Sequence, residues 1–290
     1  MEKIVAGLDA GITNSKIIEV RNLSFAYPEK EETNLIGKEY MNILNDISFS
    51  VKRNTIVGIA GRSGCGKTTL GKIITNYFKY NQTNCRKSGK VFYNSENGKN
   101  YDLDLPVFMD DYKISPIQMI FQEPRTSLNM KMALRKQLFE SISLQDNSLS
   151  KVEKENILYQ LSKELYINDI LDKKPKNISG GQRRRFGIAK ILSVKPDVIL
   201  ADEPVASLDV SIKYEILEVL FGLKKKGITI IMISHDISLL ENYADVIFIM
   251  NEGEIVEEWN PSLNELPVSE DGLELVNDSK FVNQIIDKLG

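Results

Sequence analysis

The chain has 290 residues, 42% hydrophobic and 27% charged, with a formal net charge of −3. This length and composition allow a full hydrophobic core, and the near-balanced charge implies no polyanionic partner such as nucleic acid. Two cysteines provide no disulfide framework. The chain also contains no run of about eighteen apolar residues, the length needed to span a bilayer.

A glycine-rich stretch at 61–68, with the sequence GRSGCGKT, is the first informative element after a short extension at residues 1–15. It fits the pattern G-x-x-x-x-G-K-[ST]. The apolar run 55–60 before it predicts a buried strand, and the apolar spacing of 69–75 predicts a helix. This strand–loop–helix context favours a phosphate-binding loop over a glycine-rich turn without function. Lys67 would then reach the β- and γ-phosphates, and Thr68 would offer its hydroxyl to Mg²⁺.

The middle of the chain contains two stretches that differ in their predicted secondary structure. Residues 81–115 are polar and irregular, which predicts an antiparallel arm with a variable loop. Residues 125–178 predict a helical subdomain, because 151–165 carries apolar side chains near helical spacing.

The segment Ser179-Gly180-Gly181-Gln182 predicts a helix start. Ser179 is a good N-cap for a helix over 182–192, whose free N–H groups and dipole form an anion site. The arginines at 183–185 would by themselves indicate a solvated basic face or a nucleic-acid patch, but three are too few to support nucleic-acid binding at this net charge.

Two predicted strands further along the chain end in polar residues that suit metal binding or catalysis. The apolar run 198–201 ends in Asp202 and Glu203, which suit Mg²⁺ binding and polarisation of an attacking water, unless they form an ordinary solvated pair. His235, the only histidine, follows the apolar run 228–233, so it lies where α/β sheets place ligands. Residues 195–258 predict a parallel α/β core, and 259–290 an acidic tail with a helical end at 281–289.

These motifs resemble the nucleotide-binding subunits of ATP-binding-cassette (ABC) transporters, from about residue 17 to about residue 258. Gln122 in IFQEP is similar to the family's Q-loop, and Asp209 in SLD to its D-loop. His235 is similar to its switch histidine, and Tyr27 to the aromatic residue that stacks on adenine.

The resemblance implies an α/β fold of the P-loop NTPase type: an ABC nucleotide-binding domain over 16–258, with an antiparallel β arm, a helical subdomain at about 125–178 and a tail at 259–290. It implies ATP and Mg²⁺ as cofactors. The implied catalytic residues are Glu203, His235 and Gln122, and the implied metal-binding residues are Thr68, Gln122 and Asp202. The implied nucleotide-binding residues are Tyr27, Gly61, Ser63, Gly64, Cys65, Gly66, Lys67, Thr68, Thr69, Ser179, Gly180, Gly181, Gln182 and Asp209. Gly181 is expected where a backbone approaches a phosphate held by another subunit.

Three stretches, 63–67, 121–129 and 201–212, resemble the oligopeptide, dipeptide and nickel importers. The sequence departs from that subfamily at 53–55 and has no C-terminal His-Pro-Tyr motif and no cysteine beyond Cys85 for an iron–sulfur cluster. The expected partners are a second, identical or related ATPase subunit arranged head to tail, two transmembrane permease subunits and, indirectly, a substrate-binding protein. The expected location is the cytoplasmic face of the cell membrane, as a peripheral subunit.

Two alternatives remain. One is a soluble ABC ATPase that acts on a protein complex in repair, cluster assembly or phosphonate breakdown; repair members carry long coiled-coil insertions, which this chain lacks. The other is a nucleotide switch without turnover, against which Glu203 and His235 argue.

Overall fold

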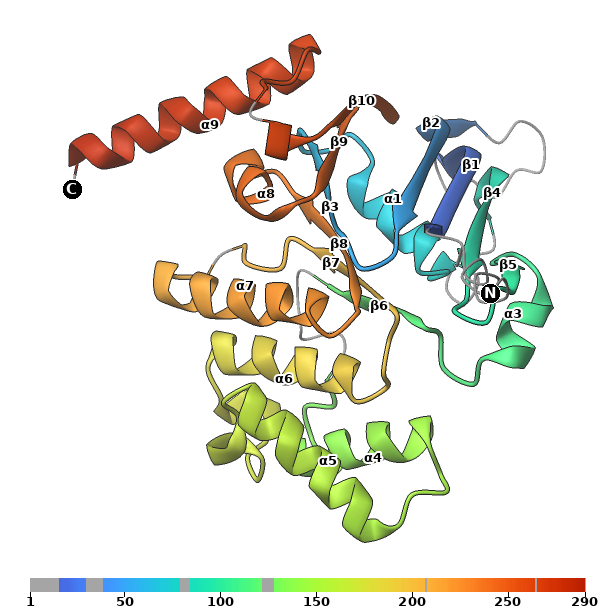
Figure 1. Ribbon diagram of the computed structural model, residues 1–290, viewed down its shortest axis with the longest axis vertical. Helices are drawn as coiled ribbons and strands as arrows, with labels where there is room; N and C mark the ends of the chain where they lie inside the picture. The colour runs from blue at the N-terminus through green and yellow to red at the C-terminus, as the bar shows by residue number, and fades with distance from the viewer. Residues whose placement is uncertain are drawn as a thin grey trace, which may run out of the picture.

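The structure is a computed structural model that describes residues 16–29, 39–78, 84–121, 128–206, 208–263 and 265–289, with side chains up to residue 279. Two β-sheets and a set of helices make up these parts of the chain (Figure 1). The antiparallel sheet has the strand order β2-β1-β4-β5. Its strands are β1 (Lys16–Pro28), β2 (Tyr40–Lys52), β4 (Arg86–Asn94) and β5 (Asn100–Asp102), and the short helix α3 (Pro106–Asp111) follows β5.

The second sheet has the order β10-β9-β3-β8-β7-β6. β3 (Ile56–Gly61), β6 (Ile117–Ile120), β7 (Val198–Asp202), β8 (Thr229–Ser234) and β9 (Val246–Asn251) pair in parallel, and β10 (Glu254–Trp259) is antiparallel to β9. Both faces of a parallel sheet are covered by other layers, so its strands read as continuous apolar runs. This explains why the sequence predicts β3, β7 and β8 so readily.

Alternate residues of these strands belong to two different cores. Val57, Ile59, Leu200 and Ile231 join the core between the two sheets, which also contains Leu70 and Ile74 of α1 (Lys67–Ile74). Their sequence neighbours Ile56, Ile199 and Ile230 join the core under the other helices. This division follows from the two-residue period of a strand.

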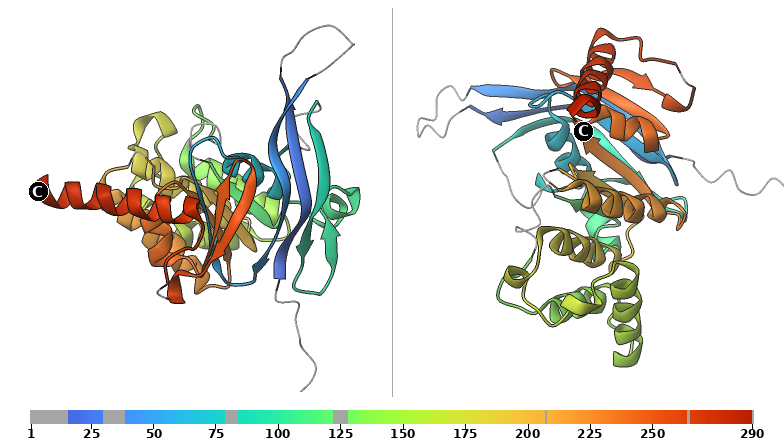
Figure 2. Two further views of the ribbon diagram at one scale, coloured as in Figure 1. Left: turned by 90° about the horizontal axis from the view of Figure 1, so that it is seen from above. Right: turned by 90° about the vertical axis from the view of Figure 1, so that its left-hand side faces the viewer.

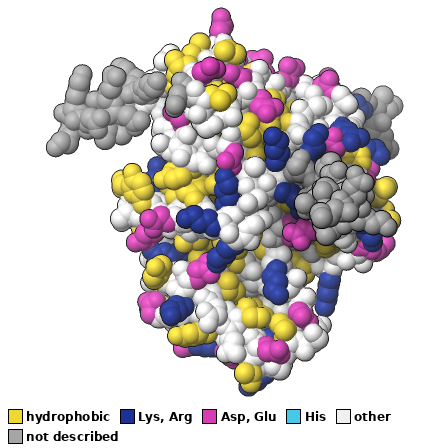
Figure 3. Space-filling model, viewed as in Figure 1, with side chains coloured by type: hydrophobic (Ala, Val, Ile, Leu, Met, Phe, Trp, Pro, Cys, Tyr) yellow, Lys and Arg dark blue, Asp and Glu magenta, His cyan; other side chains and the backbone are white. Residues whose placement is uncertain are grey.

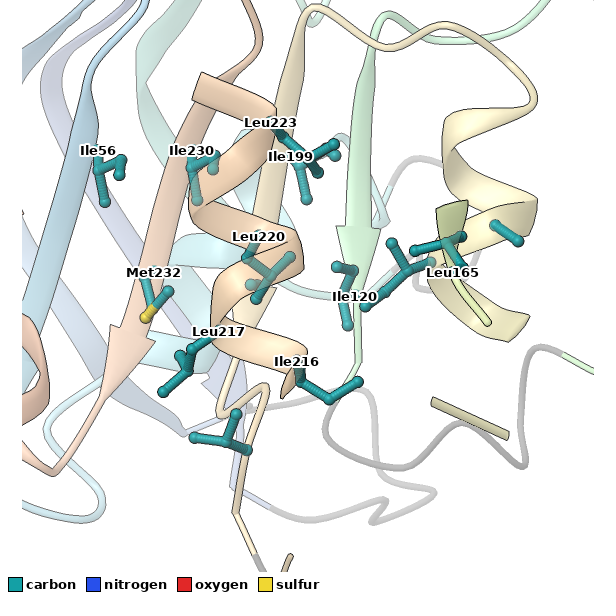
Figure 4. Close-up of a cluster of buried hydrophobic side chains, with 14 of the residues drawn as sticks. Ile56, Ile120, Leu165, Ile199, Ile216, Leu217, Leu220, Leu223, Ile230 and Met232 are labelled. Carbon is teal, nitrogen blue, oxygen red and sulfur yellow. The ribbon is translucent and has the colours of Figure 1, made fainter. Parts of the chain in front are cut away.

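Helices α6 (Gly180–Leu192), α7 (Val210–Lys224) and α8 (Ile237–Tyr243) contribute to the second core. Figure 4 shows α7 lying along the sheet, with Leu217, Leu220 and Leu223 directed towards side chains of β7 and β8. The helices α4 (Leu134–Gln145) and α5 (Lys151–Glu164) pack on each other and on α6, at the bottom of Figure 1 and of the right-hand view of Figure 2, away from the antiparallel sheet. Short 3-10 turns, η2 (Asn168–Ile170) and η3 (Pro175–Asn177), lead from α5 to α6.

The C-terminal helix α9 (Glu270–Leu289) follows the turn η4 (Pro261–Leu263) and begins eleven residues before the helical end predicted at 281–289. Its start is set by contacts distant in sequence. The Glu257 carboxylate accepts hydrogen bonds from the amides of Val268 and Ser269, and the Ser269 hydroxyl accepts one from the amide of Gly272. These bonds satisfy backbone donors at the helix entrance.

The described residues contain no helix long and apolar enough to cross a membrane. On the face shown in Figure 3, basic and acidic side chains are interspersed, and no broad basic surface covers that face.

We predict that Leu220→Ala lowers the free energy of unfolding by about 2–5 kcal/mol, because Leu220 is fully buried between α7 and the sheet and its truncation leaves a cavity. Urea denaturation of the purified chain measures this change. Tyr214→Ala on the exposed side of the same helix is the control, expected to change stability by less than about 0.5 kcal/mol. Equal effects of the two variants would contradict the placement of α7.

Candidate nucleotide-binding site

The glycine loop joins the end of β3 to the start of α1, as the sequence predicts. Gly66 has a φ of 105°, and a Cβ there would lie 2.8 Å from Leu44 Cδ2 and 2.9 Å from the Ile43 carbonyl oxygen. Only glycine combines this left-handed backbone with so close an approach of β2. Strand β2 therefore packs closely against the loop, and α1 begins directly after it.

Lys67 places a buried cation inside this loop. Its ammonium donates hydrogen bonds to the carbonyl oxygens of Gly61, at 2.7 Å, and Arg62, at 2.8 Å, and lies 3.7 Å from Cys65 Sγ. Loop carbonyls thus orient the positive charge toward the centre of the loop, where it can meet an anionic ligand.

A pocket of about 520 Å³ opens above the loop. It brings together residues that lie far apart in the sequence, because the carboxyl ends of neighbouring parallel strands meet at one edge of the sheet. The lining residues are Ile43, Ser63, Gly64, Gly66, Lys67, Thr68, Thr69, Asp202, Glu203, Ile233 and His235. Gly61 and Cys65 support the loop from beneath: a Cβ on Gly61 would lie 2.3 Å from the Met250 carbonyl oxygen, and Cys65 is buried.

Asp202, at the end of β7, fits a divalent cation. The side chain is 4% exposed, and its Oδ1 has no hydrogen-bond partner among the described residues. Burial raises the pKa of this carboxyl, while a hydrogen bond from Thr68 and the charges of Lys72 and Lys67 act in the opposite direction. A buried carboxylate oxygen without a partner is costly, and a metal ion removes that cost.

The donor set suits Mg²⁺ in particular. Thr68 and Asp202 supply a hydroxyl and a carboxylate on the same side of the pocket. The described residues contain no cluster of three or more His, Cys, Asp or Glu side chains that would form a protein cage. Mg²⁺ commonly uses only one or two carboxylates and completes its shell with water and substrate phosphates.

Glu203 and His235 form a fixed pair at the pocket. Glu203 has a φ of 46°, unusual for a residue with a side chain, and its amide donates to the Ile233 carbonyl at 3.0 Å. Its Oε1 accepts a 2.9 Å hydrogen bond from the His235 amide and lies 2.7 Å from His235 Nδ1. The Glu203 side chain is 15% exposed and that of His235 68% exposed. The carboxylate is therefore oriented and still reachable by a water molecule, as a general base requires.

The segment 179–182 begins α6, and none of its residues lines the described pocket. Ser179 Oγ accepts a hydrogen bond from the Gln182 amide, and Gln182 Oε1 accepts one from the Ser179 amide, each at 3.1 Å. The two glycines differ: a Cβ on Gly180 would meet nothing within 4 Å, whereas one on Gly181 would lie 2.8 Å from Ile212 Cγ2 of α7. Gly181 thus serves packing within this chain, and Gly180 is the exposed glycine.

Two further predicted site residues do not line the pocket. Asp209 is exposed and caps α7 by accepting a 3.1 Å hydrogen bond from the Ile212 amide. Tyr27 packs edge-on against Phe25, with ring centres 5.0 Å apart, and hydrogen-bonds to Thr69 beside the loop; burial raises the pKa of its hydroxyl. Gln122 lies outside the described residues.

Sequence reasoning missed Arg184, which is 5% exposed rather than part of a solvated basic face. Its guanidinium donates to the carbonyls of Phe121, at 2.5 Å, Glu203, at 2.8 Å, and Pro204, at 2.7 Å. Burial lowers the pKa of this arginine to about 10, and the neighbouring Asp202 carboxylate acts in the opposite direction. Helical spacing carries the missing signal, because residues 181, 184 and 188 share one buried face of α6.

The family model described as "ABC transporter" matches residues 44–206. The chain belongs to the ABC transporter family. Among curated relatives, a dipeptide transport ATP-binding protein of Haemophilus influenzae is 31% identical over 246 residues, covering 84% of this chain and 72% of the relative. An oligopeptide transport ATP-binding protein of Bacillus subtilis is 32% identical over 246 residues, covering 83% of this chain and 75% of the relative.

Solved structures agree with the fold. The ATP-binding cassette MJ0796, described as dimeric and bound to ADP and Pi, has a TM-score of 0.69 at 24% identity and covers 84% of this chain and 99% of its own. The cassette cbiO1 of Clostridium perfringens has a TM-score of 0.68 at 27% identity, with 86% of this chain and 90% of that chain covered. The predicted family, the predicted cassette fold and the predicted ATPase activity with ATP and Mg²⁺ are confirmed.

We predict that Asp202→Asn reduces Mg²⁺-dependent ATP hydrolysis by about 10²-fold or more, since metal stabilisation of charge contributes several kcal/mol. The same change removes a buried charge that has an unpartnered oxygen, so the thermal midpoint of the nucleotide-free chain should stay equal or rise. Phosphate release at varied Mg²⁺ and a thermal melt measure the two effects. Wild-type hydrolysis, or a clear fall in the midpoint, would contradict the assignment of Asp202.

Proposed function

We propose that this chain is the ATP-hydrolysing subunit of an importer for peptides, which energises transport through separate permease subunits. The proposal rests on one observation: the loop cation, the strand-end carboxylates and His235 share one pocket, in a chain that resembles dipeptide and oligopeptide transport ATP-binding proteins over more than four-fifths of its length. The family supplies the ATPase activity, and the names of these relatives supply the substrate class.

Each pocket residue has a role that its geometry supports. Lys67 and the amides of the loop hold the β- and γ-phosphates. Thr68 and Asp202 would hold Mg²⁺, together with Gln122, and the bound ion would supply positive charge that neutralises the phosphates. Glu203 takes a proton from the attacking water, and His235 keeps that carboxylate in place from the neighbouring strand end.

The proposed partner subunit follows from backbone N–H donors at the start of α6 that the chain's own pocket does not use. The capping box of α6 uses the amides of Ser179 and Gln182, which leaves those of Gly180 and Gly181 as donors for an anion at the helix start. Since this helix start does not line the chain's own pocket, we propose that it binds the γ-phosphate held by a second ATPase subunit, identical or related, in a head-to-tail dimer.

Two permease subunits and, indirectly, a substrate-binding protein would complete the importer, with this chain peripheral at the cytoplasmic face of the membrane. The dimeric state described for MJ0796 and the description of cbiO1 as part of an ABC transporter complex support such an assembly. The boundaries 16–258 for the cassette and 125–178 for the helical subdomain belong to the same proposal.

Glu203→Gln tests the chemistry and the transport role together. We expect ATP binding to persist while steady-state hydrolysis falls about 10²–10⁴-fold, because the base is lost and its shape is kept. Uptake of a labelled oligopeptide by cells carrying only this variant should fall in parallel. Glu218→Gln, on the exposed surface of α7, is the matched control and should retain both activities.

The two readouts separate the candidate functions. Loss of hydrolysis with unchanged peptide uptake would favour a soluble ABC ATPase that acts on a protein complex. Hydrolysis near the wild-type rate in Glu203→Gln would remove Glu203 from the catalytic role.

A mixing experiment tests the head-to-tail arrangement. Lys67→Ala disables the loop of its own chain. Gly180→Asp places a repulsive charge at the start of α6, here called the signature helix, in a position with open space in the monomer; in the proposed dimer this charge faces the opposite site. Each variant alone should be inactive, but a mixed dimer of the two keeps one intact site and should recover up to about half of the activity.

The control is the mixed dimer of the double variant Lys67→Ala/Gly180→Asp with wild type, isolated from wild-type homodimers, in which each site lacks one part. Absence of recovery in the first mixture would show that the signature helix acts within its own chain. Gly222→Asp, at an open glycine of α7, controls for the added charge.

A further inference from the structure

The three consecutive arginines of α6 have three different sets of partners. Arg183 donates to the carbonyls of Pro175, at 3.0 and 3.3 Å, and Ile178, at 3.2 Å, just before its own helix. Arg185 pairs with Glu215 of α7. Arg184 alone among the three reaches the ends of two strands, at Phe121 after β6 and at Glu203 and Pro204 after β7.

The Arg184 contacts are specific to a guanidinium. Three carbonyl oxygens from two separate segments surround one side chain that is 5% exposed. A guanidinium offers five donors in a planar fork, whereas an ammonium is a compact point charge and a neutral amide has only two donors. A buried cation is retained at a desolvation cost, which its hydrogen bonds offset.

These contacts complete the restraint on the catalytic carboxylate. The amide of Glu203 is bonded to Ile233 of β8, and its carbonyl is bonded to Arg184 of α6. Both peptide groups flanking the Glu203 Cα are therefore hydrogen-bonded, at a residue whose φ of 46° is a strained backbone conformation for a residue with a side chain. Without the Arg184 hydrogen bond, the Glu203 carbonyl loses this restraint, and the Glu203 side chain can adopt a wider range of orientations.

We propose that Arg184 is a positioning residue that couples the signature helix to Glu203. Residue 184 lies about one helical turn from Gly180, so a shift of the helix start moves the guanidinium with it. Through the Glu203 and Phe121 carbonyls, the shift reaches the catalytic carboxylate and the segment that continues to Gln122. Because the coupling rests on the proposed head-to-tail dimer, occupancy of the partner's nucleotide site would adjust the base of this chain.

Arg184→Lys and Arg183→Lys form a matched pair for the test. Both keep the charge, both lie on the same helix, and both replace a guanidinium that donates to backbone carbonyls. We expect Arg184→Lys to lower kcat about 10-fold or more, to leave the ATP dissociation constant within about twofold, and to reduce the Hill coefficient for ATP towards 1. Arg183→Lys should leave all three values close to those of the wild type.

His235 provides a second readout that requires no hydrolysis. It is the only histidine of the chain, so a tag-free ¹⁵N-labelled sample gives a single set of imidazole signals in NMR spectra. Since His235 Nδ1 lies 2.7 Å from Glu203 Oε1, a displaced Glu203 must shift those signals. We expect a shift in Arg184→Lys and none in Arg183→Lys.

The outcomes separate this inference from the proposed function. Unchanged His235 signals together with wild-type kcat in Arg184→Lys would overturn the positioning role. Equal losses in both variants would overturn it as well, because Arg184 would then only stabilise the helix. A lower kcat and shifted signals with an unchanged Hill coefficient would overturn the coupling between sites. A wild-type chain that hydrolyses no ATP would instead contradict the proposed function, and the His235 signals would still decide the role of Arg184.

Discussion

Parallel pairing of β3, β8 and β7 is the constraint on which the whole site depends. Ala60 lies opposite Ser234, and Asp202 lies opposite Ile233, so three strands end at nearly the same height. The loop after β3, the carboxylates after β7 and the histidine after β8 then converge, although they are spread along more than half of the chain. A shift of any one strand by two residues would keep its apolar face buried but would move its functional residue by about 6–7 Å, out of reach of the others.

At this edge the chain tolerates features that would be costly elsewhere. Asp202 has a buried oxygen without a partner in the described residues, Glu203 has a left-handed backbone, and Arg184 is a buried cation. The extensive cores on both faces of the sheet allow such local costs. In the proposed function these costs have a use, because the unpartnered Asp202 oxygen and the restrained Glu203 carboxylate would already be oriented for a ligand before it binds.

Much of the fold could be predicted because its signals are local. Strands buried on both faces appear as short apolar runs, and the phosphate loop depends on residues within eight positions of one another. The same applies to Asp202, Glu203 and His235, which directly follow such runs. Family resemblance added the roles of Gln122, Asp209 and Tyr27; these remain predictions, since Gln122 lies outside the described residues and the other two lie outside the pocket lining.

The features that sequence reasoning missed depend on contacts between distant segments. The early start of α9 depends on Glu257, eleven residues before Val268, and on the packing of Val276. The burial of Arg184 depends on carbonyls 63 and 19 residues away in the chain. A charged residue within a charged triplet suggests solvent exposure, and only the tertiary structure supplies the carbonyls that make its burial affordable.

The signature helix is consequently part of both nucleotide sites in the proposed dimer. Its start presents Gly180 to the outside, its inner face holds the Glu203 backbone through Arg184, and its flank packs Gly181 against Ile212 of α7. A rigid helix moves as one unit, so these three surfaces cannot respond separately. In the proposed dimer, the face on which a substitution falls would therefore determine its effect: at Gly180 it would alter the partner's site, at Arg184 the chain's own base, and at Gly181 the packing of both helices.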